Sequence, residues 1–482
     1  MTKAEHVDVL IIGAGLSGIG AAAHLAKDLP GTTYAVLERR AVSGGTWDLF
    51  RYPGVRSDSD MHTLGYRFRP WRGAVALADG QSILDYVRDT AREFGVDEHV
   101  RYGHRVVSAA WDSSTARWTV TAEVDGGTHE ITADFLWACS GYYDYDEGYT
   151  PELEGRERFG GQVVHPQHWP DDLDVNGKRV VVIGSGATAV TLVPALAAEG
   201  AGHVTMLQRS PTYVLPVPGH DSLKARMTRL IGEERSYVVT RWKNIALQSA
   251  LYRVSRARPG LVRKVVRKAN VAQLPPGYAV DTHFNPTYDP WDQRMCLVPD
   301  GDLFAAITAG SASIVTDRIA TFTETGIELA SGEHLEADVV VTATGLNLQI
   351  FGGAELVVDG EQVKPHETMA YRAMMLSGVP NFAFTIGYTN ASWTLKADLV
   401  AEYVVRLLGR LRATGTRSVV PVRDESVTEV PLMDFDAGYV QRVVHTLPRQ
   451  GTVEPWALKQ NYLYDALKIR TAKLDDGVLR WH

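Results

Sequence analysis

The sequence contains the same structural unit twice, and this duplication constrains the fold more than any other feature. Each copy has a short β-branched strand, a glycine turn, an alanine-rich helix and a second apolar strand. Parallel strands joined in this way form a βαβ unit. We therefore predict an α/β fold with two Rossmann-like dinucleotide-binding domains. The strand, helix and strand are expected at 7–12, 16–28 and 33–38 in the first copy, and at 179–183, 187–198 and 203–208 in the second.

The first glycine turn carries the residues that a dinucleotide site needs. In Gly13-x-Gly15-x-x-Gly18 the first glycine makes the turn, the second admits a pyrophosphate and the third allows close helix packing. Glu38 follows 20 residues after Gly18 at a strand end, where a carboxylate accepts hydrogen bonds from ribose hydroxyls. We expect these four residues to bind a dinucleotide; a tight turn without a ligand is the weaker alternative.

The second glycine turn differs from the first in the charge at its strand end. It reads Gly184-x-Gly186-x-x-Ala189, and Arg209 stands 20 residues after Ala189, where the first copy has a glutamate. A guanidinium can bind the 2′-phosphate of NADP, which a carboxylate would repel. We expect this copy to bind NADPH through these residues, with Ser210 as a helper; the alternative is a solvated surface arginine.

Composition excludes several classes of protein. The formal charge of -8 gives no general attraction to nucleic acid, and no apolar run approaches 18 residues. The two cysteines, Cys139 and Cys296, are too few and too far apart for a disulfide framework, a CxxC redox pair or a zinc site. We expect a cytoplasmic protein with no metal site and no nucleic-acid partner.

Between 215 and 290 the strand and helix alternation stops, and a basic stretch bounded by prolines predicts a helical insertion. Residues 224–268 contain 13 Lys and Arg against two acidic residues, a net charge of +11. We hypothesise that this segment contacts a membrane surface peripherally; a solvated surface or a contact between domains is the alternative. On one helix, Arg263, Lys264, Arg267 and Lys268 should share a face, with Val262, Val265 and Val266 lying toward another.

Two longer motifs carry a family resemblance. Phe159-x-Gly161-x-x-x-His165-x-x-x-Trp169 matches the fingerprint FxGxxxHxxxW of Baeyer–Villiger monooxygenases, whereas flavin-containing monooxygenases usually have Tyr or Phe in the last place. The segment from Gly44 to Asp58 matches the second signature of that family, [AG]GxWxxxx[FY]P[GM]xxxD, at every fixed position. The chain thus resembles class B flavoprotein monooxygenases of the Baeyer–Villiger type, and within them most the ethionamide-activating monooxygenases.

The resemblance implies a domain order for nearly the whole chain. It implies an FAD-binding domain made from both chain ends, an NADPH-binding domain inserted into it, and a helical excursion inside the second. It also implies that the His165 segment links the domains, responds to NADPH and does not touch substrate. The expected boundaries are 1–145 and 346–482 for FAD, 146–214 with the linker and 291–345 for NADPH, and 215–290 for the insertion.

The resemblance further implies the chemistry. The enzyme would use FAD, NADPH and O2 to convert ketones to esters or lactones through a C4a-peroxyflavin, and would oxidise thioethers or thioamides. Arg294 would be the catalytic cation, since arginine stays protonated near neutral pH, and Asp58 would orient it. The alternative for this pair is a structural ion pair. Many relatives have Lys before the arginine, where this chain has Gln293, so NADPH preference would depend mainly on Arg209.

Further cofactor contacts are expected from the same motifs. Trp47 and Tyr52 should pack near the flavin ring and Trp393 should approach the nicotinamide, although aromatic residues are more often plain core. Residues that complete the expected cofactor sites are Thr46, Trp47, Asp58, Val107, Thr344 and Gly345.

Two other functions stay open at this stage, and a third is excluded. A flavin-containing N- or S-monooxygenase is disfavoured by Trp169, Asp58 and Arg294 together. A non-catalytic NADPH or redox sensor would show no substrate-dependent consumption of NADPH. A disulfide reductase would need a redox cysteine pair, which the sequence lacks. The identity of the ketone or sulfide substrate has no readable code in the sequence.

Overall fold

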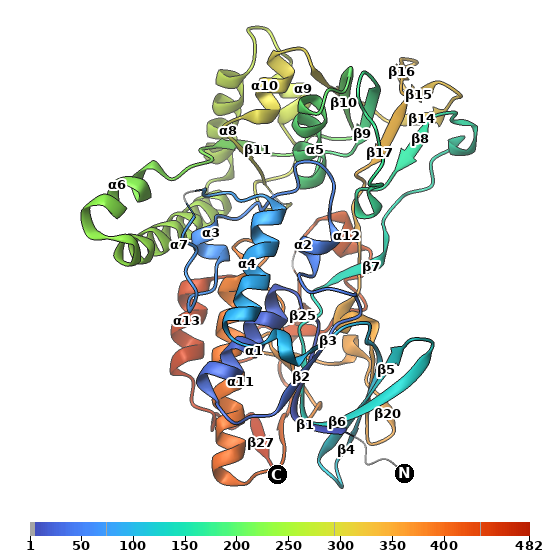
Figure 1. Cartoon of the computed structure of the whole chain (residues 1–482). Helices are drawn as coiled ribbons and strands as arrows, with labels where there is room; N and C mark the ends of the chain where they lie inside the picture. Colours follow the sequence, from blue (N-terminus) through green and yellow to red (C-terminus); the bar gives the residue numbers. More distant parts are fainter. Residues whose placement is uncertain (1–4, 74, 294, 434) are drawn as a thin grey trace.

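Two sheets, one below the other in Figure 1, each carry one of the two glycine turns. The structure is a computed structural model that describes residues 5–73, 75–293, 295–433 and 435–482. Arg294 therefore lies outside the described residues. The observed elements confirm the predicted α/β fold class with two Rossmann-like units.

The first sheet combines strands from both ends of the chain. Its nine strands follow the order β20-β19-β4-β5-β6-β1-β2-β3, with β23 also paired to β6. Strand β1 is parallel to β2 and β6, whereas β4, β5 and β6 form an antiparallel meander. The strands are β1 (Glu5–Ile12), β2 (Tyr34–Leu37), β3 (Val100–Arg101), β4 (Arg105–Asp112), β5 (Arg117–Val124), β6 (Gly127–Ala138), β19 (Glu355–Val358), β20 (Glu361–Gln362) and β23 (Phe382–Phe384).

The second sheet is entirely parallel and is built from the middle of the chain. Its five strands follow the order β13-β10-β9-β17-β8. Both faces are covered, which explains why its central strands are continuous runs of valine and isoleucine. The strands are β8 (Gln162–Val164), β9 (Arg179–Ile183), β10 (His203–Gln208), β13 (Ala312–Thr316) and β17 (Val339–Thr342).

Helices cover the sheets as the apolar patterns require. Helix α1 (Leu16–Asp28) packs against α4 (Gly80–Glu93) and α11 (Trp393–Thr414) beside the first sheet, and α5 (Ala187–Ala198) packs against α10 (Asp302–Thr308) beside the second. Two short strands, β7 (Tyr143–Gly148) and β18 (Leu346–Leu348), pair with each other. The chain passes between the two sheets at these strands, so both crossings lie side by side.

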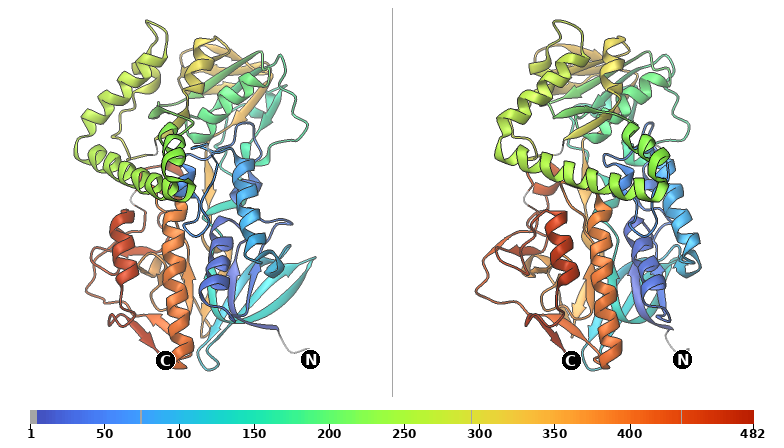
Figure 2. Two further views of the ribbon diagram at one scale, coloured as in Figure 1. Left: turned by 60° about the vertical axis from the view of Figure 1, so that its left-hand side comes forward. Right: turned by 90° about the vertical axis from the view of Figure 1, so that its left-hand side faces the viewer.

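The insertion begins with a strand rather than a helix. Strand β11 (Val214–Val217) comes first, and the helices follow it. After the helices, β12 (Cys296–Pro299) returns and pairs in parallel with β11. Figure 2 shows the long α7 lying across the molecule, and Figure 1 shows α6 and α7 projecting to one side. The helices are α6 (Ser222–Ile231), α7 (Glu233–Ala257), α8 (Pro259–Gln273) and α9 (Val280–Phe284).

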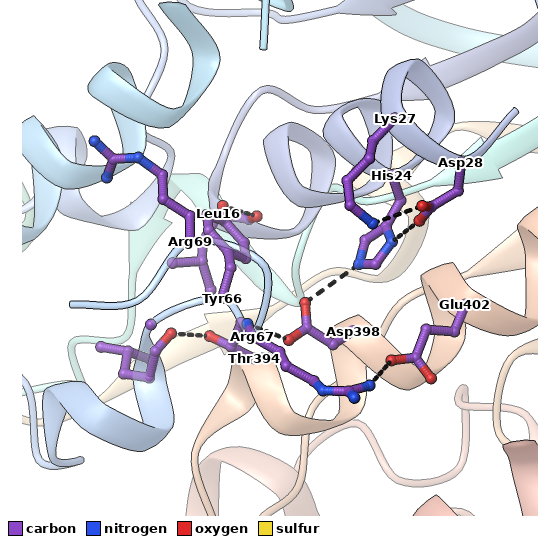
Figure 3. Close-up of polar contacts among 12 residues, drawn as sticks. Leu16, His24, Lys27, Asp28, Tyr66, Arg67, Arg69, Thr394, Asp398 and Glu402 are labelled. Atoms are coloured by element: carbon purple, nitrogen blue, oxygen red, sulfur yellow. Dashed lines mark hydrogen bonds and ion pairs between the residues drawn. The ribbon is translucent and has the colours of Figure 1, made fainter. Parts of the chain in front are cut away.

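Buried polar contacts tie α1, α11 and α7 together. The Asp398 carboxylate, on α11, accepts a hydrogen bond of 2.9 Å from the backbone N–H of Arg67 and lies 3.6 Å from Nε2 of His24 on α1 (Figure 3). Nδ1 of His24 is 2.9 Å from the Asp28 carboxylate. From α7, the buried guanidinium of Arg241 donates to the carbonyls of His62 and Gly65, at 2.6 and 2.8 Å. These contacts fix the insertion on the first sheet's helical layer.

Candidate functional site

A large cavity lies at the carboxyl ends of the parallel strands in the first sheet. It has about 1760 Å³ of empty space, part of it open to solvent. Residues at or just after the ends of β1, β2 and β6 line it, and Ala187 and Thr188 at the start of α5 close it from the second sheet. Ligands of doubly wound sheets bind at this position. The cavity therefore brings the first glycine turn and the second unit to one place.

The first glycine turn has the close backbone approach that its sequence predicts. Gly13 has a φ of +99°, and a β-carbon on Gly18 would lie only 1.8 Å from the Gly13 carbonyl oxygen. Gly15 precedes α1, whose first turn has no acidic residue and no side-chain cap. The N–H groups at this end of α1 are thus available for an anion, and Gly13 and Gly15 line the cavity.

Glu38 directly follows β2 at the cavity wall and is held by backbone groups. Its two carboxylate oxygens accept hydrogen bonds from the N–H of Ala14, at 2.8 Å, and of Arg40, at 2.9 Å. Burial raises the pKa of Glu38 above its ordinary value, against the effect of these two hydrogen bonds. Each oxygen retains a lone pair for a further donor, such as a ribose hydroxyl.

The segment from Gly44 to Asp58 joins the two halves of the cavity. Its backbone N–H at Gly44 donates to the Ala14 carbonyl at 3.0 Å, and a β-carbon on Gly45 would lie 2.9 Å from the Cα of Gly15. At the other end, a β-carbon on Gly54 would lie 2.7 Å from Cβ of Ala195 on α5. This signature is therefore the bridge between the two sheets.

Aromatic side chains form one wall of the cavity. Trp47, Tyr52 and Trp393 all line it, and Tyr142 joins them. The indole Nε1 of Trp393 donates to Oγ of Ser17 at 2.7 Å, which attaches the start of α11 to the start of α1. A planar apolar ring system fits such a wall.

Two expected FAD contacts differ in their placement. Thr46 lines the cavity, and its hydroxyl lies 3.2 Å from that of Tyr145. Val107 is not among the lining residues, although its neighbours His104, Arg105 and Val106 are. The pairing of β4 with β5 shifts register between Val106 and Ser108, so Val107 sits at an irregularity of the strand.

Neither glycine of the second turn lines this cavity, although Ala187 and Thr188 directly after it do. Gly184 has a φ of +137°, and a β-carbon there would lie 2.3 Å from the Ala343 carbonyl oxygen, whereas a β-carbon on Gly186 would meet open space. Ala189 is fully buried against the sheet. Arg209 and Ser210 are exposed beyond the end of β10, where the Ser210 carbonyl accepts a hydrogen bond of 3.2 Å from Ser185 Oγ. The turn, Arg209 and Ser210 thus form an open edge, not an enclosed pocket.

Thr344 and Gly345 belong to the crossing between the sheets. The Thr344 hydroxyl donates to the Tyr149 carbonyl at 2.6 Å, and Gly345 has a φ of +119°. Arg442 lies over the ring of Tyr149, 3.5 Å from its centroid, and donates to the Leu346 carbonyl at 3.0 Å. These contacts hold the crossing strands, and neither Thr344 nor Gly345 lines the cavity.

A second, smaller cavity adjoins the first. It has about 610 Å³ of empty space, and Asp58, Ser59 and Ala391 line both cavities. Asp58 therefore stands at their boundary. The other walls come from the insertion and from the segment around position 294: Gln248, Leu251, Trp291, Met295 and Leu297, with Thr389, Asn390 and Ser392.

The linker motif lies beside the crossing strands and lines neither cavity. Phe159 is buried against Phe322, with ring centroids 5.9 Å apart. His165 packs so closely on Gly148 of β7 that a β-carbon there would lie 2.0 Å from its Cε1. Burial lowers the pKa of His165 below its ordinary value. The motif thus packs against the strands that cross between the sheets, and its expected response to NADPH stays a prediction.

Comparison with known proteins decides the family. The chain is 55% identical to the FAD-containing monooxygenase EthA of Mycobacterium tuberculosis, covering 99% of this chain and 98% of the relative. It is 53% identical to EthA of Mycolicibacterium smegmatis, covering 99% and 97%. The chain belongs to the family of FAD-containing monooxygenases. This family confirms the resemblance drawn from the motifs, and the first glycine turn, Glu38 and the aromatic wall fit its FAD.

Family models match two parts of the chain, and solved structures share its fold. Residues 76–251 match the flavin-binding monooxygenase-like family, and residues 11–73 match the NAD(P)-binding Rossmann-like domain. The fold is similar to that of an oxidized steroid monooxygenase bound to NADP, with a TM-score of 0.77, 22% identity and 99% of both chains covered. It is also similar to an open cyclohexanone monooxygenase, with a TM-score of 0.75, 20% identity and 99% and 100% covered.

Several lining residues were not predicted. Ser140, Tyr142, Gln349 and Tyr388 reach the large cavity from the ends of other strands or from loops. Gln248 and Leu251 reach the small cavity from α7, which the sequence marks only as basic and helical. Which residues line the small cavity depends on how the insertion packs against the first sheet. No local pattern in the sequence encodes that packing.

Proposed function

We propose that this chain is a Baeyer–Villiger monooxygenase that consumes NADPH and O2 and inserts one oxygen atom into ketones, giving esters or lactones. Thioethers and thioamides are further substrates of the same site. The observation that carries the proposal is the pair of adjoining cavities with Asp58 at their boundary. One cavity fits a flavin, and the other has a largely apolar wall suited to a small organic substrate.

FAD would supply the activation of oxygen when bound in the large cavity. The α1 N-terminus and Gly15 would bind its pyrophosphate and Glu38 its ribose hydroxyls. Trp47 and Tyr52 would contact its ring, and Trp393 would approach the nicotinamide of NADPH. NADPH would bind at the second turn, with Arg209 on its 2′-phosphate. This assignment is supported by the open space at Gly186 and the exposure of Arg209 at the end of β10.

The residues around Asp58 would then handle charge and orientation. Oxygen insertion creates negative charge next to the substrate, which a permanent cation stabilises. Arg294 is proposed as that cation on the strength of its sequence motif, and its neighbours Trp291 and Met295 line the small cavity with Asp58. The Asp58 carboxylate would orient the guanidinium and partly neutralise it.

A substrate panel tests the reaction. The panel holds linear, cyclic and aryl ketones, sulfides and a soft amine, with NADPH oxidation and oxygenated product measured together. Ester formation coupled to NADPH use supports the proposal. Oxidation of the amine or sulfide without any ester would instead identify an N- or S-monooxygenase, and NADPH use that no substrate stimulates would favour a sensor.

Two variants test the assigned residues. Arg294→Ala should keep its FAD and still oxidise NADPH, but release H2O2 with almost no ester, because it loses a few kcal/mol of charge stabilisation. Asp58→Ala should show a milder uncoupling. Ser59→Ala is the matched control, since Ser59 lines both cavities and its hydroxyl is 3.5 Å from Asp58. Normal ester yield in Arg294→Ala would assign the chemistry to another residue.

A further inference from the structure

The arm formed by α6, α7 and α8 (residues 222–273) exposes an unusual number of apolar side chains. Among the described residues, 18 large apolar side chains are exposed, and 11 of them belong to this arm, which is about a tenth of the chain. The most exposed are Leu230, at 75%, Leu247, at 63%, and Val265, at 57%. The others are Leu223, Ile231, Val238, Val239, Trp242, Val254, Leu261 and Val271. Such a concentration marks an interaction surface.

The valines of α8 divide differently from the sequence expectation. Val262 and Val266 are buried, at 6% and 3%, whereas Val265 is exposed. Arg263 pairs with Asp289 and Arg267 with Asp281 of this chain. The expected separation into one basic and one apolar face is therefore wrong for Val265. Only Val262 and Val266, which are four positions apart on the helix, pack into the core.

Some cations of the arm form ion pairs within this chain, and others do not. Ion pairs within the chain join Lys224 to Glu233, Lys243 to Asp221 and Arg256 to Asp292. The side chain of Arg241, on α7, is buried. Seven other exposed cations form no salt bridge and no side-chain hydrogen bond with the residues that the structure describes. They are Arg226, Arg229, Arg235, Arg253, Arg258, Lys264 and Lys268. In the sequence of the arm several of them stand next to an exposed apolar residue, as Arg229 does to Leu230 and Lys264 to Val265.

The charge distribution of the whole chain directs this arm toward an anionic partner. Residues 224–268 carry +11, while the rest of the chain, with 36 Lys and Arg against 55 Asp and Glu, carries -19. An anionic surface would attract the arm and repel the body. A two-fold contact with a second copy would place the seven free cations against the same seven cations, which opposes self-association through this face.

We propose that the arm docks on an anionic lipid surface, with its cations at the headgroups and its apolar side chains in the interface. Trp242, 48% exposed on α7, has the amphipathic ring that favours this depth. No helix in the described ranges has the length and apolar character needed to cross a membrane, so the docking is peripheral. Nucleic acid would use the cations but leave the apolar side chains in water.

Docking would bring one wall of the small cavity close to the lipid. Gln248 and Leu251, which line that cavity, belong to the same helix as Trp242 and Leu247. An apolar substrate that partitions into the bilayer would then be concentrated near the cavity. The docking itself does not depend on the reaction that the enzyme catalyses.

Vesicle flotation of the FAD-loaded protein tests the proposal. Vesicles of phosphatidylglycerol and phosphatidylcholine in equal parts should carry the protein at 0.1 M salt, and pure phosphatidylcholine vesicles should not. The triple variant Arg226→Gln, Arg229→Gln, Arg235→Gln should bind on the order of a hundredfold more weakly, because each neutralised cation costs about a fivefold loss. A second variant, Trp242→Ser with Leu247→Ser, should also bind more weakly.

The matched control neutralises three exposed cations outside the arm, Arg156, Lys473 and Arg480. It changes the net charge by the same amount and should bind vesicles like the unaltered protein. Unchanged FAD content and substrate turnover in solution show that each variant is folded. Equal losses in the arm and control variants, or no binding of the unaltered protein to anionic vesicles, would overturn the proposal. Concentration-dependent dimers that Trp242→Ser abolishes would assign the face to a second copy.

Discussion

Gly15 and Gly45 come from different motifs, yet a β-carbon on Gly45 would lie 2.9 Å from the Cα of Gly15. One glycine ends the turn before α1 and the other stands before the short helix α2 (Thr46–Leu49). Their approach leaves the α1 N-terminus accessible from the cavity, which both residues line. The family's second signature would thus complete the proposed flavin site that the first fingerprint begins.

Gly15→Val should give protein without FAD. The backbone at Gly15, with a φ of -82°, tolerates valine, so the effect comes from the lost space and not from strain. A side chain there would meet Gly45 and block the α1 N-terminus. The measurement is the ratio of visible flavin absorbance to protein absorbance after purification.

Gly186→Ala is the control, since a β-carbon at this second turn meets no atom within 4 Å. It should retain its flavin. Full flavin content in Gly15→Val would show that the first fingerprint is assigned to the wrong ligand.

The second unit could be predicted from the sequence residue by residue. The expected strand, helix and strand at 179–183, 187–198 and 203–208 coincide with β9, α5 and β10. The reason is local: buried β-branched runs, a glycine turn and an alanine-rich helix each have a short-range signature. The first sheet was less predictable, because β19, β20 and β23 join it across more than 200 residues of chain.

The candidate site was predictable only where a motif encodes it. Motifs single out Glu38 and Asp58, and both line the large cavity. By contrast, nothing in the sequence distinguishes the buried Arg241 from the exposed Arg235 six positions before it. Both are arginines on one basic helix. Which of them is buried depends on the carbonyls of His62 and Gly65, which are brought there by tertiary packing.

Arg209→Ala should raise the Michaelis constant for NADPH much more than that for NADH. Only NADPH carries the 2′-phosphate, and a charge-assisted contact of roughly 1.5–3 kcal/mol corresponds to a change of about 10- to 150-fold. Steady-state kinetics with both cofactors measures the difference. Arg156→Ala, another exposed arginine, should change neither constant. Equal effects of Arg209→Ala on NADPH and NADH would contradict the assignment.

Arg241→Met should destabilise the attachment of α7. The substitution removes a buried guanidinium that donates to two carbonyls and lies 3.8 Å from the Asp398 carboxylate. Breaking a buried pair by removing one partner costs about 3–5 kcal/mol. Thermal unfolding and hydrogen exchange across α7 should both show the loss. Arg235→Met, exposed on the same helix, should change stability by less than about 0.5 kcal/mol.

The contribution of His24 to stability should depend on pH. Burial alone would lower the pKa of His24, but the Asp398 and Asp28 carboxylates outweigh burial and the net pKa is raised above 6.5. A raised pKa in the folded state means that folding favours the protonated form. The stabilisation is therefore complete below the unfolded pKa near 6.5 and is lost as pH rises through the raised folded value.

His24→Gln should cost roughly 1–2 kcal/mol at pH 5.5 and clearly less at pH 9, as measured by thermal unfolding of the FAD-loaded protein at each pH. His445→Gln changes an exposed histidine and should show no such difference between the two pH values. If the loss in His24→Gln were the same at pH 5.5 and pH 9, the histidine would act through packing alone and not through its charge beside Asp398.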